Sequence, residues 1–117
     1  MNKILTLAAF AAASVVSLQA AAAGNAESGK LLVEKYNCAS CHGKDFNSPI
    51  DPSYPKLAGQ HQDYLQHALV SYRRGNDGMN GRTNAIMSGQ AKALTDKDIQ
   101  DIAAYLHSLP GSLVLEK

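Results

Sequence analysis

The sequence predicts a small all-α domain with three main helices joined by long loops. Three segments place hydrophobic residues at helical spacing, and no segment has the alternation of a half-buried β-strand. Between these segments lie two long stretches that carry several prolines or glycines and no periodic pattern. A chain of 117 residues has room for one such domain and is too short for a multidomain enzyme.

The first predicted helix has one apolar stripe, formed by Gly29, Leu32, Val33 and Tyr36. Gly29 has no side chain to pack. We therefore expect it to let the last helix cross closely, near Ile102 and Tyr105.

The second predicted helix repeats this spacing with Leu65, Ala68, Leu69 and Tyr72. Gly75 is expected to end it, since glycine is common just beyond a helix C-terminus.

The third predicted helix has its stripe at Ile99, Ile102, Ala103 and Leu106. Thr95 and Asp98 resemble an N-terminal capping box, and the helix should end at Leu109–Gly111.

The stretches from Gly43 to Gln60 and from Asn76 to Ala93 are predicted to be irregular. Loops of this length in a small domain usually surround a bound group. The three apolar stripes also need a shared partner, so we expect a bulky prosthetic group.

Residues 1–23 have the pattern of a secretory signal peptide. Lys3 supplies a positive start, the stretch from Ile4 to Leu18 is mostly apolar, and small residues lead up to Gly24. We expect cleavage near Ala23, which leaves residues 24–117 as a periplasmic domain.

A membrane anchor is the alternative for this segment. Ser14, Ser17 and Gln19 interrupt it, alanine dominates it, and no stop-transfer pattern follows, so insertion would be weak. We expect no membrane insertion after cleavage.

The charge balance argues against a partner recognised by bulk charge. The chain has 11 Lys and Arg against 10 Asp and Glu, and Lys3 is the only charged side chain before Gly24. A chain beginning at Gly24 is formally neutral, which argues against nucleic-acid binding.

The segment Cys38–Ala39–Ser40–Cys41–His42 is a C-x-x-C-H signature of covalent haem attachment. Two thiols about one helical turn apart can add to the two vinyl groups of one haem, and His42 can reach the iron. The alternatives are a redox dithiol, a disulfide, or half a zinc site that recruits His61. The export signal and the helical pattern favour one covalently bound haem c.

From Gly24 onward the chain resembles a class I c-type cytochrome, and within that class one domain of the two-haem periplasmic cytochromes c. The resemblance lies in Asn37–Gly43, in Tyr54–Gln60, and in Ile102–Leu106 of the last helix. A single attachment motif makes this a monohaem protein. The tract from Asp45 to Pro52 departs from the family layout.

The resemblance implies that a methionine is the sixth iron ligand, opposite His42. Met79 and Met87 both stand in an M-x-G context. In the family the ligand lies a short, regular distance before the last helix with an arginine upstream, which fits Met87 and Arg82. The expected metal ligands are therefore His42 and Met87, with His61 the least implausible alternative among the other histidines.

The resemblance also implies outer partners for the cofactor. A proline carbonyl after the attachment motif, here Pro55, would accept a hydrogen bond from the axial histidine. Arg82 or Tyr64 could hydrogen-bond a haem propionate.

These features predict a periplasmic one-electron carrier, a monomer that meets its redox partners transiently and is not an enzyme. No catalytic acid, base or nucleophile is recognisable. Two alternatives stay open: a haem subunit of a larger oxidoreductase, and a gas- or peroxide-binding haem protein with a displaceable sixth ligand.

Overall fold

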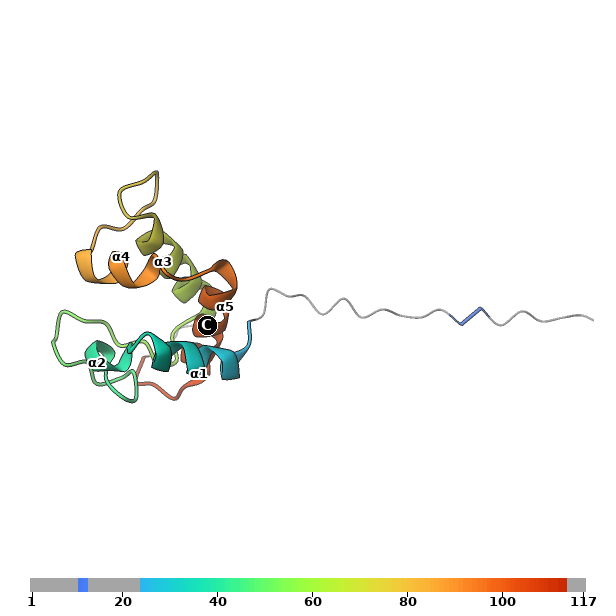
Figure 1. Cartoon of the computed structure of the whole chain (residues 1–117). Coiled ribbons are helices and arrows are strands. Elements are labelled where there is room, and N and C mark those ends of the chain that lie inside the picture. The colour runs from blue at the N-terminus through green and yellow to red at the C-terminus, as the bar shows by residue number, and fades with distance from the viewer. Residues whose placement is uncertain (1–10, 13–23, 114–117) are drawn as a thin grey trace, which may run out of the picture.

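The computed structural model describes residues 11–12 and 24–113, which form an all-helical domain (Figure 1). The elements are α1 (Ala26–Lys35), α2 (Ala39–His42), α3 (Gln62–Arg74), α4 (Ala85–Ala91) and α5 (Asp96–Ser108). The predicted leader, apart from residues 11–12, lies outside the described residues. Of the helices described, none has the length and apolar character needed to cross a membrane.

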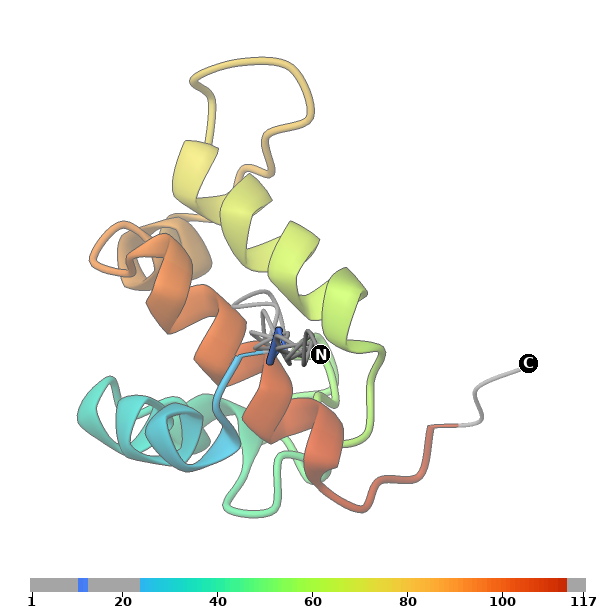
Figure 2. The same cartoon turned by 90° about the vertical axis from the view of Figure 1, so that its right-hand side faces the viewer.

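Helix α5 lies between α1 and α3, and α4 packs against α3 (Figures 1 and 2). The core is formed where these helices meet. Its buried members are Val33, Phe46, Ala58, Leu65, Leu94, Ile99, Ile102, Ala103 and Leu106.

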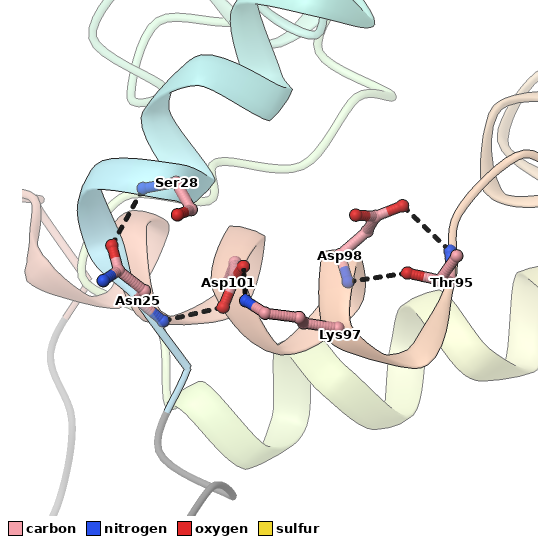
Figure 3. A network of polar contacts seen from close by, with 6 residues as sticks. All are labelled: Asn25, Ser28, Thr95, Lys97, Asp98 and Asp101. Atoms are coloured by element: carbon pink, nitrogen blue, oxygen red, sulfur yellow. Dashed lines mark hydrogen bonds and ion pairs between the residues drawn. The ribbon is translucent and has the colours of Figure 1, made fainter.

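The three long helices confirm the periodic patterns, and their ends confirm the predicted signals. Gly75 follows α3 with a φ of 56°, a conformation that favours glycine. Both hydrogen bonds of the capping box at the start of α5 are present, from the Asp98 N–H to the Thr95 hydroxyl and from the Thr95 N–H to the Asp98 carboxylate (Figure 3).

Helix α4 lies inside the stretch from Asn76 to Ala93, so the prediction that this whole stretch is irregular was wrong. Seven residues are too few to show an amphipathic period, and Gly89 weakens the helical signal further. Asn84 starts the helix because its side chain accepts the N–H groups of Ile86 and Met87.

The stretch from Gly43 to Gln60 is irregular, as predicted, and is anchored to the core by Phe46. This side chain is 3% exposed, and its ring meets the ring of Tyr105 edge to face at 6.2 Å. The Phe46 carbonyl accepts the N–H groups of Leu57 and Ala58. The tract from Asp45 to Pro52, which departs from the family layout, therefore contains a core residue.

Asp101 is a carboxylate with 3% exposure, and it ties the start of α1 to α5. Its two oxygens accept the backbone N–H of Asn25 at 2.8 Å and the ammonium group of Lys97 at 2.6 Å (Figure 3). A buried carboxylate needs such partners because unpaired burial of a charge is costly.

Helices α1 and α5 cross closely at Gly29, as predicted. A Cβ placed at this glycine would overlap the Asp101 carbonyl oxygen and lie 2.7 Å from the Tyr105 Cβ. Only glycine fits this crossing without movement of α1.

Gly29→Ala is expected to lower the free energy of unfolding by about 1–3 kcal/mol, because the added methyl group forces α1 away from α5. Gly89→Ala is the matched control, since it lies in a helix and a Cβ there meets nothing within 4 Å. We expect the control to gain up to about 1 kcal/mol from helix propensity. Urea unfolding of the haem-loaded protein measures both, and equal effects would contradict the steric account.

Candidate functional site

The attachment motif follows directly on α1. The Cys38 N–H donates to the Val33 carbonyl at 3.0 Å, and Cys38 is the residue before α2. The one-turn helix α2 places Cys41 and His42 on the turn after Cys38. This local helix gives the two thiols the spacing that the sequence implied.

Both cysteines are free thiols, and both are half-buried. Burial raises the pKa of the Cys38 thiol, with a smaller contribution from the neighbouring Cys41. Among the described residues no group of three or more His, Cys, Asp or Glu side chains could hold a metal ion. The zinc alternative therefore has no ligand set in this part of the chain.

His42 is buried, with 6% exposure, and its ring is held by a backbone carbonyl. The Nδ1 atom lies 2.9 Å from the Pro55 oxygen, which confirms the predicted partner. A carbonyl can only accept, so Nδ1 carries the hydrogen in this contact, and in the neutral imidazole the lone pair is then on Nε2. This is the tautomer that an iron ligand requires.

Cys38, Cys41 and His42 line a cavity whose other walls are mainly apolar. The stripe of α3 forms one wall, and Leu94, Ile102 and Leu106 form another. The predicted apolar stripe of α3 thus faces the motif.

The two candidate methionines occupy different environments. Met87, on α4, is half-buried and lines the cavity, whereas Met79 is 87% exposed and does not. Figure 1 shows α4 above and α2 below, and both helices contribute residues to the cavity lining. Of the two methionines, the fold brings only Met87 to the cavity that holds His42.

The remaining histidines lie away from the cavity wall. His61 is the exposed residue before α3, and His67 is exposed on α3. The Nδ1 atom of His107 lies 2.7 Å from the Gln60 carbonyl. None of the three shares the cavity with the attachment motif.

Arg82, Tyr64 and Tyr72 form a polar cluster on the cavity wall. The Arg82 guanidinium carbon lies 5.6 Å from each tyrosine ring centroid, and an Arg82 N–H group lies 3.5 Å from the Tyr64 hydroxyl. Hydrogen bonds to the Tyr64 and Tyr72 hydroxyls raise the pKa of Arg82, so its charge is permanent. The part that Tyr72 plays beside Arg82 was not foreseen, because periodicity had placed it only on the apolar stripe.

The residues of the cavity fit a haem. Two thiols could form the thioether bonds, and the His42 Nε2 could bind the iron. The apolar walls could contact the porphyrin faces, and the Arg82 guanidinium could bind the haem carboxylates. A helical domain with these groups around one apolar cavity is a c-type cytochrome.

The chain belongs to the cytochrome c family, whose model matches residues 26–110. Cytochrome c4 of Stutzerimonas stutzeri is 40% identical over 97% of this chain and 53% of its own length. Cytochrome c-554(548) of Halomonas halodenitrificans is 40% identical over 74% of this chain and 98% of its own length. The cytochrome subunit of sulfide dehydrogenase from Chlorobaculum tepidum is 34% identical over 62% of this chain.

The fold is that of a class I cytochrome c. The crystal structure of reduced recombinant cytochrome c4 from Pseudomonas stutzeri matches with a TM-score of 0.67 and 40% identity, over 78% of this chain and 48% of that chain. The chain thus spans about half the length of these two cytochromes c4. A cytochrome c domain binds covalently attached haem c, and Cys38–His42 is the motif with the spacing for that attachment.

Asn84→Ala is expected to weaken α4, because the cap on the Ile86 and Met87 N–H groups is worth about 1 kcal/mol. Amide hydrogen exchange in α4 should become about 5-fold faster. Asn84→Ser keeps a capping oxygen and should change the exchange rate little. Unchanged exchange in the alanine variant would show that the cap does not hold Met87 in place.

Proposed function

We propose that this chain is a periplasmic one-electron carrier in which His42 and Met87 would hold the haem iron. The proposal includes removal of residues 1–23, which leaves residues 24–117 as a monomeric domain. The observation that carries it is the meeting of His42 and Met87 on one cavity, while Met79 points to solvent.

The haem supplies one-electron redox chemistry when it is bound. The protein keeps the two ligands, His42 and Met87, in fixed positions. The Pro55 carbonyl fixes the His42 ring, and the Asn84 cap fixes the turn that carries Met87. Ligands fixed from outside in this way keep their positions when the charge at the site changes by one electron.

The cavity wall carries few of the side chains that most often act as a general acid or base. Among the described residues that line it there is no Asp or Glu, and His42 is its one histidine. Apart from the two cysteines, the other ionisable side chains of the wall are Lys56, Arg82 and four tyrosines, and one-electron transfer needs a proton from none of them.

Electrons would pass at the attachment side of the cavity. Ser40 is exposed, and Cys38 and Ala39 beside it are half-buried, so this side comes close to the surface. Contacts between redox partners are typically small and brief, and they need only such a local patch.

A haem subunit of a larger oxidoreductase is the second candidate. The observation that favours it is the similarity to a protein named as the cytochrome subunit of sulfide dehydrogenase. The ligands and the redox role would be the same, and one partner would be permanent.

Optical spectra of the exported, haem-loaded protein test the ligand assignment. We expect a low-spin reduced spectrum that carbon monoxide does not change, and a weak far-red sulfur-to-iron band in the oxidised form. Met87→Leu conserves volume and apolar character, so it should remove the band and admit carbon monoxide with the fold intact.

Met79→Leu is the matched control and should leave both spectra unchanged. Rapid carbon monoxide binding by the unaltered protein would contradict the proposal and favour a gas- or peroxide-binding haem protein. Loss of the band in the Met79 variant alone would reassign the ligand.

A further inference from the structure

Helix α3 divides its side chains between two faces. One face lines the haem cavity, and the other lines a groove between α3 and α5, the two helices that lie side by side in Figure 2. The groove and the cavity share no lining residue. The groove is therefore a separate feature on a face that the cofactor does not use.

The rim of this groove is rich in hydrogen-bond donors. His67, Arg73 and Arg74 of α3 line it together with Gln100 of α5. The one acidic residue of the lining is Asp96, and it is already paired with Arg73, which also donates to the Leu94 carbonyl at 3.0 Å. Arg73 thus holds the start of α5 against α3 and neutralises Asp96.

Arg74 is left with an uncompensated charge. Its side chain and that of His67 are exposed, and within the described part of the chain neither makes a hydrogen bond or an ion pair. A guanidinium in this position favours a carboxylate, which it can bind with two parallel hydrogen bonds.

The bottom of the groove is apolar. Val70 is half-buried there, and Ile99 is 2% exposed. The groove has a volume of about 330 Å³, several times the roughly 30 Å³ that one water occupies in the liquid. An apolar floor beneath a cationic rim suits a short peptide segment better than a single small anion.

We propose that this groove docks an acidic segment of a partner protein, with an apolar side chain over Val70 and a carboxylate on Arg74. A partner seated there would leave the attachment side of the haem cavity free to exchange electrons. The site would let the chain be held by one protein while it meets another. The proposal does not depend on which residue ligates the iron.

The test uses the haem-loaded protein and a short synthetic peptide of alternating leucine and glutamate. We expect the peptide to shift the backbone amide resonances of His67, Arg74 and Gln100. Arg74→Gln should weaken binding about 5-fold, the effect of losing one exposed ion pair. Arg74 is exposed, so this variant should keep the fold and the optical spectrum of the unaltered protein.

Lys30→Gln is the control, since it removes one positive charge from α1, away from the groove. It should bind the peptide as the unaltered protein does. Equal weakening by the two variants would overturn the proposal in favour of bulk charge. Shifts confined to the haem cavity, or the same groove shifts with sodium acetate at equal concentration, would also overturn it. Because the optical spectrum is recorded separately, each of these failures is distinguishable from failure of the carrier assignment.

Discussion

The close crossing of α1 and α5 at Gly29 sets the position of the attachment motif at the haem cavity. Helix α1 leads straight into the attachment motif, and the Cys38 N–H is bonded back to Val33 in α1. Any shift of α1 along α5 would therefore move both thiols and His42 together. Asp101 strengthens the same contact, because its carboxylate accepts the Asn25 N–H one turn before Gly29.

The cavity wall and the hydrophobic core share four buried side chains. Leu65, Leu94, Ile102 and Leu106 belong to the buried cluster and also line the cavity. A domain of this size has little apolar surface to bury. Haem c adds a large apolar surface to that cluster, and its covalent attachment keeps that contribution permanent. Cofactor binding and folding stability are thus linked through shared residues.

Three polar groups around the cavity have different roles. The Pro55 carbonyl selects one tautomer of His42, and the Asn84 cap holds the turn that carries Met87. Arg82 supplies a charge held between two tyrosine rings. None of these groups needs to gain or lose a proton for an electron to pass.

Much of the fold was predictable because it depends on local signals. The stripes of α1, α3 and α5, the capping box at Thr95 and the glycine after α3 are all set by residues close in sequence. The role of Gly29 was also predictable, since a glycine inside an apolar stripe indicates a close contact. The attachment motif needs one turn of helix, and the structure provides it.

The parts that were missed depend on contacts between distant residues. Helix α4 is short and contains a glycine, so its stability comes from the Asn84 cap and from packing on α3. The burial of Phe46 and of Asp101 depends on Tyr105 and on Asn25, which lie far away in the chain. The choice between Met79 and Met87 rested on family resemblance, because both have the same local sequence, and the fold separates them by burial.

X-ray absorption at the iron edge, recorded in both oxidation states, tests the central claim most directly. The account predicts a sulfur atom in the coordination shell of the iron in both states, at nearly the same distance. That result would establish a methionine ligand that stays bound in both oxidation states. A shell without sulfur in either state would contradict the account.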